Sequence, residues 1–327
     1  MEPLLIVFIA VALLFDYLNG FHDSANVVAT VIASRAMSPR MALGMTALAN
    51  LLGPFLFGVA VATTIGNEVV SSQAVTIPVA LAALFSAILW NLATWLLGIP
   101  SSSSHALLGG FMGAALAGFG LGVIREEGLT KVLLGLFISP ILGAGLGWLV
   151  MRAVLKLGEK LSPRVNVFFL RAQWLTAATL GLSHGTNDAQ KTMGIMTLGL
   201  VAFGVLPTFH VPVWVIAASA SAIALGTAMG GWRLIKTMGG RFYRIRSTHA
   251  FSSQLAGTAV ILGAALLGGP VSTTQVVSST IVGAGAAERL SKVRWGTAMQ
   301  IVVAWVLTIP ATILLGALGY WLLSRLL

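Results

Sequence analysis

The sequence predicts an all-α polytopic membrane protein made of two inverted-topology repeats, and three observations support this. Hydrophobic residues make up 57% of the 327 residues, charged residues make up 9%, and the mean hydropathy is +0.95. A soluble domain carries about 25% charged residues because its surface faces water, so this composition excludes a soluble protein. The apolar residues form long runs, and two polar motifs recur in the same order about 165 to 170 residues apart.

Ten apolar stretches account for most of the chain. In order they cover residues 4–34, 41–63, 76–98, 101–121, 131–151, 171–205, 212–231, 249–268, 271–286 and 296–324. A membrane-spanning helix needs about 20 apolar residues, so most stretches suit one crossing. The stretches at 4–34 and 171–205 are too long for one straight crossing, and polar residues interrupt both. We therefore expect a long or broken transmembrane helix in each place.

Two pairs of neighbouring stretches are joined by short uncharged segments. One joint reads Gly98-Ile99-Pro100-Ser101-Ser102-Ser103-Ser104-His105, and the other reads Gly268-Gly269-Pro270-Val271-Ser272-Thr273-Thr274-Gln275. Proline and glycine end a helix, and a serine or threonine run suits the start of the next one. Because neither joint carries a charge that would hold it in water, we predict two re-entrant helical hairpins, at about 76–121 and about 249–286, whose tips end inside the protein.

An internal repeat becomes visible when the two joints are aligned. Placing Pro100 on Pro270 brings Ser102-Ser103-Ser104 onto Ser272-Thr273-Thr274, and the long stretches match as Gly20-Phe21-His22-Asp23 and Gly185-Thr186-Asn187-Asp188. Two polar motifs in register indicate two homologous halves. The first repeat is predicted at residues 1–155 and the second at residues 156–327.

The basic residues predict the topology. With the N-terminus outside, one crossing for each long stretch and both ends of each hairpin on one side, fifteen of the nineteen lysines and arginines fall in cytoplasmic loops. They are Arg35, Arg40, Arg152, Lys156, Lys160, Arg164, Arg171, Arg233, Lys236, Arg241, Arg244, Arg246, Arg289, Lys292 and Arg294. Only Arg125, Lys131 and Arg325 fall outside, and Lys191 stays within the membrane.

This distribution satisfies the positive-inside rule. The basic residues behind the net charge of +10 are therefore interpreted as topology determinants, and no nucleic-acid partner is expected. Both termini are predicted outside a plasma (inner) membrane, with the first hairpin opening outward and the second inward. Inverted repeats with broken helices meeting at the midplane are typical of secondary transporters.

Asp23 and Asp188 occupy equivalent positions in the two halves. A charge at the centre of a bilayer costs about 2.5–3.5 kcal/mol on insertion scales, so each carboxylate needs a partner. Ser24 and Asn26 follow Asp23, and Asn187 precedes Asp188. Carboxylates surrounded by neutral oxygen ligands suit a small hard cation, so we expect cation binding or proton transfer here.

Other polar residues near these carboxylates leave alternatives open. Lys191 and Asp16 have the simpler interpretation of an internal ion pair, Lys191 with Asp188 or with Asp16. His22 and His184 adjoin the two motifs and could relay protons. Gly109 and Gly110 either pack closely against a neighbouring helix or allow bending.

The hydroxyl-rich joints predict an anion site. The first backbone N–H groups of a helix lack acceptors within the helix, and the helix dipole adds partial positive charge there. With hydroxyl donors, two such helix starts can hold one anion between them. Capping combined with small-residue packing is the alternative, but duplication of the joint favours the anion.

A multivalent anion beside two carboxylates is repelled unless cations or protons neutralise them, so the sequence predicts coupled binding and hence symport. Two other functions fit the sequence less well. An intramembrane aspartyl protease would use Asp23 and Asp188 but leaves the duplicated joints unexplained, and a passive anion channel would not need the carboxylates. No enzymatic activity is expected.

The chain resembles the inorganic phosphate transporter (PiT) family, which carries a duplicated G-x-N-D signature. The second copy is Ser183-His184-Gly185-Thr186-Asn187-Asp188-Ala189-Gln190-Lys191-Thr192-Met193-Gly194. The first is Asn19-Gly20-Phe21-His22-Asp23-Ser24-Ala25-Asn26, in which His22 stands where the family usually has asparagine. Both joints also resemble the hairpin tips of the family, and the resemblance covers the whole chain.

The resemblance implies sodium- or proton-coupled uptake of phosphate, and sodium is favoured. It implies phosphate binding at Ser102, Ser103, Ser104, Ser272, Thr273, Thr274 and Gln275. It implies sodium binding at Asp23, Ser24, Asn26, Asn187 and Asp188, with accessory roles for His22, His105, Gln190 and Lys191. Sodium is thus a co-transported substrate, and no cofactor is expected. Because the family includes sulfate carriers, sulfate remains an alternative substrate. A homodimer is expected by analogy.

Overall fold

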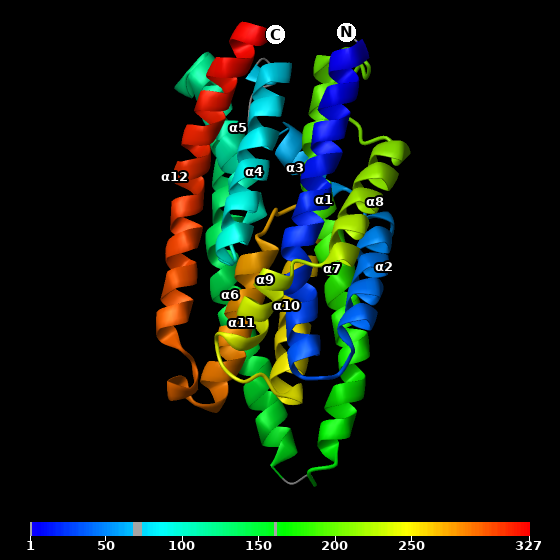
Figure 1. Cartoon of the computed structure of the whole chain (residues 1–327), viewed down its shortest axis with the longest axis vertical. Helices are drawn as coiled ribbons and strands as arrows, with labels where there is room; N and C mark the ends of the chain where they lie inside the picture. The colour runs from blue at the N-terminus through cyan, green and yellow to red at the C-terminus, as the bar shows by residue number, and fades with distance from the viewer. Residues whose placement is uncertain (1, 68–73, 160–161) are drawn as a thin grey trace.

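The computed structural model describes residues 2–67, 74–159 and 162–327 as an elongated helical bundle. Both chain ends lie at the same end of the bundle (Figure 1). The helices are α1 (Glu2–Ala33), α2 (Pro39–Phe57), α3 (Ala60–Asn67), α4 (Ile77–Leu97), α5 (Ser103–Phe119), α6 (Glu126–Gly158), α7 (Val165–Ala202), α8 (Val213–Met229), α9 (Trp232–Gly240), α10 (Ser247–Leu266), α11 (Thr273–Glu288) and α12 (Trp295–Leu326). Two short 3-10 helices, η2 (Leu121–Val123) and η3 (Leu290–Lys292), precede α6 and α12.

The composition and lengths of these helices fit a multi-pass membrane protein. Six of the described helices are long and apolar enough to cross a membrane, and the pair α8 and α9, bent by 70°, is a seventh if it counts as one crossing. Large apolar side chains are exposed on the outer faces, among them Ile141, Leu175 and Leu314. In a membrane these faces contact lipid rather than water.

The two long polar stretches form continuous helices. α1 has 32 residues and α7 has 38, and neither breaks at its polar segment. The long helices were predicted, but the breaks lie in the next segments of each half, at Gly58 between α2 and α3 and at Gly230-Gly231 between α8 and α9. A helix satisfies its own backbone groups even among polar side chains. The polar residues of α1 and α7 therefore need side-chain partners, and a break is unnecessary.

The two predicted hairpins are the pairs α4–α5 and α10–α11. We call residues 98–105 the first tip and residues 268–275 the second tip. Gly98 and Gly268 end α4 and α10 with φ of +67° and +69°, a left-handed conformation that glycine adopts without steric cost. The two tips approach the middle of the bundle from opposite ends (Figure 1). The side of the membrane to which each hairpin opens stays a prediction, as does the inverted relation of the halves.

The halves interlock through their hairpins. α5 packs along α12 and α11 packs along α6, so the last helix of each half covers the hairpin of the other. Glycines allow the close approach: a Cβ on Gly113 would lie under 3.0 Å from the backbone of Ile313, and a Cβ on Gly283 would meet the backbone of Ala144. Gly109 likewise faces the Thr312 side chain in α12, so packing is the confirmed interpretation for this residue.

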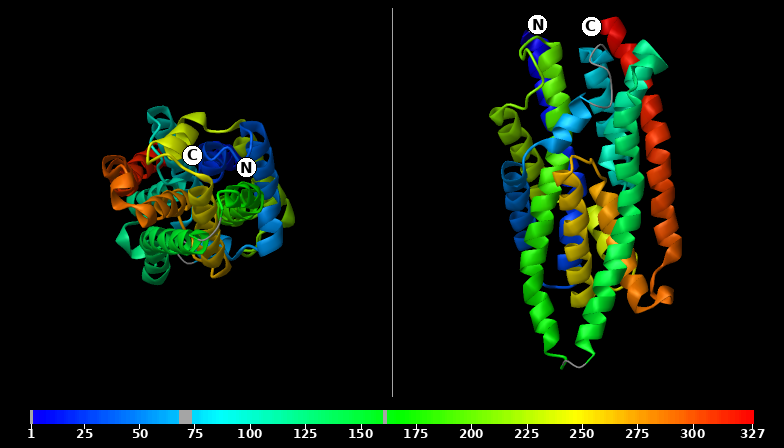
Figure 2. Two further views of the ribbon diagram at one scale, coloured as in Figure 1. Left: turned by 90° about the horizontal axis from the view of Figure 1, so that it is seen from below. Right: turned by 180° about the vertical axis from the view of Figure 1, so that it is seen from behind.

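The predicted boundary at residues 155/156 falls inside α6, so the link between the halves follows Gly158. α6 and α7 run the length of the bundle and are linked at the end opposite the termini (Figure 2). The loops that carry most of the basic residues lie toward that end. Lys160 lies outside the described residues, as does the side chain of Lys131.

Two apolar clusters flank a polar layer. One cluster contains Phe8, Phe15 and Met193, and the other contains Val28, Leu180 and Ile261. Between them, the polar middle segments of α1 and α7 are buried together with both tips. The fold therefore places the predicted site residues in the interior, at mid-height.

Candidate functional site

The two tips begin α5 and α11 in the same way. The Ser102 hydroxyl accepts a hydrogen bond from the His105 N–H at 3.1 Å, and the Ser272 hydroxyl accepts one from the Gln275 N–H at 3.3 Å. These are N-cap bonds that fix the start of each helix. The hydroxyls of Ser103 and Thr273, one residue later, are free to point into the polar layer.

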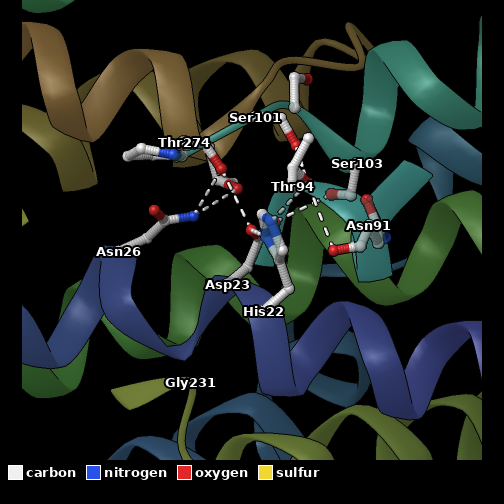
Figure 3. A network of polar contacts seen from close by, with 12 residues as sticks. His22, Asp23, Asn26, Asn91, Thr94, Ser101, Ser103, Gly231 and Thr274 are labelled. Atoms are coloured by element: carbon white, nitrogen blue, oxygen red, sulfur yellow. Dashed lines mark hydrogen bonds and ion pairs between the residues drawn. The ribbon is translucent and has the colours of Figure 1, made fainter. Parts of the chain in front are cut away.

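Asp23 of α1 lies between both tips (Figure 3). Its Oδ2 accepts a hydrogen bond from Ser103 Oγ at 2.9 Å, and its Oδ1 accepts one from Thr274 Oγ1 at 3.2 Å. His22 Nδ1 lies 2.7 Å from the same Oδ1. Asn26 Nδ2 donates to Thr274 Oγ1 at 3.0 Å. One carboxylate thus contacts a hydroxyl from each half of the chain.

Asp188 of α7 has a corresponding set of neighbours. Its Oδ2 accepts a hydrogen bond from Thr273 Oγ1 at 2.9 Å, and its Oδ1 accepts one from Asn187 Nδ2 at 2.9 Å. His184 Nε2 lies 2.9 Å from Oδ2. Asn187 also donates to the Val271 carbonyl at 3.0 Å.

The carboxylates of the two halves meet. Ligand atoms of Asp23, His184 and Asp188 lie within 4.8 Å of one another, and all three residues are buried. Two charges at this distance repel by about 3 kcal/mol at an effective dielectric constant of 20. Such a pair needs compensating positive charge.

Lys191 supplies part of that charge. Its ammonium forms an ion pair with Asp188 and donates to Ser104 Oγ at 2.6 Å and to the Val271 carbonyl at 3.0 Å. Of the two predicted pairings for Lys191, the structure forms the one with Asp188. Asp16 instead accepts a hydrogen bond from Thr192 Oγ1 at 2.5 Å.

Two predicted site residues lie away from this cluster. Ser24 accepts a hydrogen bond from the Gly231 N–H at 2.9 Å and donates to the Phe21 carbonyl. Figure 3 places Gly231 on the opposite side of α1 from Asp23. Successive residues on a helix do not share a face, so Ser24 contacts the break between α8 and α9, and its role in a cation site stays a prediction.

Gln190 has the corresponding role in the other half. Its amide donates to the Gly58 carbonyl at 2.7 Å and accepts from the Val61 N–H at 2.8 Å. These are backbone groups left unpaired by the break between α2 and α3. Gln190 therefore stabilises that break, and its accessory role in the site stays a prediction.

His105 and Gln275 are the last residues of the two tips and contact each other. Gln275 Nε2 lies 3.2 Å from His105 Nδ1. Both residues line a mostly apolar cavity of about 720 Å³ between α6 and α12. Within the described chain, His105 Nε2 and Gln275 Oε1 have no hydrogen-bond partner, so a polar edge of the tips faces this cavity.

Several contributing residues were not predicted from the sequence. Thr94 of α4 contacts Ser101 Oγ at 2.8 Å and His22 Nε2 at 3.4 Å. Val271 contributes only its backbone, as an acceptor for Asn187 and Lys191. A threonine in an apolar helix and a backbone carbonyl carry no sequence signal that separates them from ordinary packing residues.

Comparisons with known proteins identify the family of this chain. A family model for the phosphate transporter family matches residues 19–162 and 155–316. A probable low-affinity inorganic phosphate transporter of Bacillus subtilis (strain 168) is 43% identical over 99% of this chain and 98% of its own length. One of Rhizobium meliloti (strain 1021) is 44% identical over 98% of this chain and 96% of its own length.

The fold is also similar to a solved structure described as "The sodium-dependent phosphate transporter". The TM-score is 0.89 at 24% sequence identity, over 99% of this chain and 100% of the other. At that identity the likeness concerns the fold. With the family model matching both halves and close relatives matching end to end, the chain belongs to the phosphate transporter family and is a membrane transporter rather than an enzyme.

Proposed function

We propose that this protein imports inorganic phosphate by symport with sodium, through alternating access to the polar layer. The observation that carries the proposal is that hydroxyls from both tips donate to the two buried carboxylates. The names of the relatives support phosphate, and the name of the structural neighbour supports sodium.

The tips suit a phosphate ion. The helix starts at Ser103 and Thr273 bring N–H groups and hydroxyls to one buried region without an arginine. Helix N-termini bind phosphate through these N–H groups and the helix dipole. Ser104 and Thr274 add further hydroxyls from the same two helix starts.

The Asp23 end of the layer suits a sodium ion. Asp23 offers two carboxylate oxygens, and the hydroxyl oxygens of Ser103 and Thr274 and the amide of Asn26 lie beside it. A hydroxyl has one proton to donate and lone pairs to accept. With sodium at Asp23, the Ser103 and Thr274 oxygens can coordinate the ion while their protons turn to phosphate. The same two hydroxyls would thereby couple cation and anion binding.

Charge balance favours the coupling. With neutral histidines, the carboxylates of Asp23 and Asp188 carry two negative charges and the Lys191 ammonium carries one positive charge. The buried site therefore has a net charge of −1. A divalent phosphate would add two negative charges. A bound cation therefore increases phosphate affinity, and by linkage phosphate increases cation affinity equally.

Protons are the second candidate for the coupling ion. His22 Nδ1 lies 2.7 Å from Asp23 Oδ1, so a proton can be shared between them at the same position that sodium would take. Sodium at Asp23 would have four neighbouring oxygen-bearing side chains, whereas a proton on Asp23 would have one histidine, His22, in direct contact. We therefore favour sodium.

Labelled phosphate uptake into proteoliposomes tests the proposal, under an inward sodium gradient, an inward proton gradient or neither. Sodium-driven uptake that excess sulfate does not inhibit is the expected result. Uptake driven only by protons would make the proton the coupling ion, held by the His22–Asp23 pair. Inhibition by sulfate would make sulfate a substrate. Absence of gradient-driven uptake of both anions would contradict the proposal.

A further inference from the structure

Lys191 and Asn26 occupy equivalent positions in the two halves. Each stands three residues after the carboxylate of its half, Asn26 after Asp23 and Lys191 after Asp188. Residues three apart on a helix share a face, so each side chain reaches the tips beside its own aspartate. The halves therefore differ in charge at one position, where the first has a neutral amide and the second an ammonium.

The Lys191 ammonium has three acceptors. They are the Asp188 carboxylate, the Ser104 hydroxyl and the Val271 carbonyl, the last two at 2.6 and 3.0 Å. An ammonium has three N–H donors, so all of them are used and none is left to bind phosphate. The Lys191 side chain is 3% exposed, so its ammonium is buried among these three acceptors.

This acceptor set is the one that an alkali cation prefers. A carboxylate, a hydroxyl and a backbone carbonyl are hard oxygen ligands, and here they come from α7 and from both tips. The ammonium occupies the place where a free cation would neutralise Asp188 and hold the tips together. Asp23 differs, because its partners in the described chain are His22, Ser103 and Thr274, none of which has a permanent charge.

We propose that the Lys191 ammonium is a tethered cation that fills the second of two equivalent cation positions. This inference rests on the proposed symport. A free cation then enters with phosphate only at the Asp23 position, so the chain takes up one cation fewer per phosphate than a carrier with two open positions. Lys191 thus sets the stoichiometry of coupling and does not bind phosphate directly.

Counting sodium ions on the unmodified protein is the first test. Purified protein saturated with phosphate is expected to bind one radioactive sodium ion per chain, and Asp23→Asn is expected to abolish that binding. Two sodium ions per chain, one of which survives in Asp23→Asn, would overturn the inference. Failure to bind phosphate at all would instead contradict the proposed function.

Exchanging the two equivalent residues gives a matched pair of variants. Lys191→Asn gives the second half the Asp-x-x-Asn pattern of the first and is expected to add one sodium ion per phosphate in dual-label uptake. Asn26→Lys gives the first half the Asp-x-x-Lys pattern and is expected to remove one. If an active Lys191→Asn variant kept the sodium-to-phosphate ratio of the unmodified protein, the lysine would have only a structural role as the ion-pair partner of Asp188. A much weaker phosphate affinity at unchanged ratio would make it a phosphate ligand.

If Lys191→Asn does not transport phosphate, thermal unfolding tests the inference instead. Without its lysine, Asp188 is a buried carboxylate with no permanent positive charge beside it, so the unfolding midpoint of Lys191→Asn in detergent is expected to rise more steeply with sodium concentration than that of the unmodified protein. Choline at equal ionic strength is the control. Equal sodium dependence in the two proteins would overturn the inference. If protons replace sodium in the unmodified protein, the gain of a sodium response in Lys191→Asn is still expected.

Discussion

Asp23 and Asp188 show how two residues of the same type can differ in function through their neighbours. Both are buried, and both accept a hydrogen bond from a hydroxyl of the second tip. Asp188 also pairs with an ammonium, whereas Asp23 pairs with hydroxyls and a histidine. The carboxylate without permanent compensation is the one expected to respond to cations.

Replacing Asp23 with asparagine is expected to abolish sodium-driven phosphate uptake. A carboxylate about 4 Å from a cation contributes about 4 kcal/mol at an effective dielectric constant of 20, so uptake at a fixed low sodium concentration should fall at least a hundredfold. Asp16→Asn is the matched control, because it makes the same chemical change on α1 at a carboxylate bonded to Thr192. Equal sodium dependence of Asp23→Asn and unmodified protein would contradict the prediction.

Replacing Thr274 with valine is expected to weaken phosphate binding while the fold is kept. The hydroxyl donates to Asp23 and accepts from Asn26, and hydrogen bonds to charged groups contribute about 1.5–3 kcal/mol. The phosphate dissociation constant, measured by calorimetry at saturating sodium, should rise at least tenfold. Thr312→Val is the control, because it removes a buried hydroxyl that donates to backbone carbonyls of its own helix. If both variants changed phosphate affinity equally, the tip hydroxyl would have no specific role.

Duplication in the sequence pairs Asp23 with Asp188 and the first tip with the second, and the structure brings these residues together. The sequence did not predict the positions of Ser24 and Gln190, which lie beside site residues in sequence but face helix breaks. Sequence proximity gives no direction around a helix until the neighbouring helices are known.

At the scale of the helices, close crossings with α6 and α12 hold the two tips in place. α5, which begins at the first tip, packs on α12 through glycines, and α11, which begins at the second tip, packs on α6 in the same way. Small residues at a crossing let two membrane helices approach closely. The position of each tip therefore depends on a helix from the other half.

Gly113→Ala is expected to destabilise the crossing of α5 and α12. The added methyl would lie under 3.0 Å from the Ile313 backbone, and overpacking of this kind costs about 1–3 kcal/mol. The midpoint of thermal unfolding in detergent should fall. Gly145→Ala is the control, because nothing in the described chain lies within 4 Å of a Cβ at that position in α6. A stability of Gly113→Ala equal to or above that of Gly145→Ala would contradict the close crossing.

The helix pairs α4–α5 and α10–α11 could be predicted from sequence because an uncharged run of glycine, proline and hydroxyl residues separates two apolar stretches without a charged loop. The breaks at Gly58 and at Gly230-Gly231 could not. Their unpaired backbone groups are satisfied by Gln190 and Ser24 from the opposite half, and such tertiary partners leave no local pattern. α1 and α7 stay continuous for a different reason, because a helix satisfies its own backbone groups and its polar side chains need only partners.

At the scale of the whole molecule, the halves share one site. Ser103 of the first half and Thr274 of the second both donate to Asp23, and Ser104 of the first accepts from Lys191 of the second. A ligand bound beside Asp23 would therefore contact both hairpins. The proposed alternating access would use this arrangement, because a ligand bound between the tips contacts the hairpins of both halves.

The orientation of the bundle in the membrane can be tested because the chain contains no cysteine. Ser324 is exposed near the C-terminus, and Ser162 is exposed between α6 and α7, at the opposite end of the bundle. The basic loops predict that the Ser162 end faces the cytoplasm. In intact cells a membrane-impermeant maleimide is therefore expected to label Ser324→Cys and to leave Ser162→Cys unlabelled until the membrane is permeabilised. The unmodified protein gives the background, since it has no thiol to react. Labelling of Ser162→Cys alone in intact cells would reverse the orientation, so that the first hairpin opens to the cytoplasm and the second to the outside.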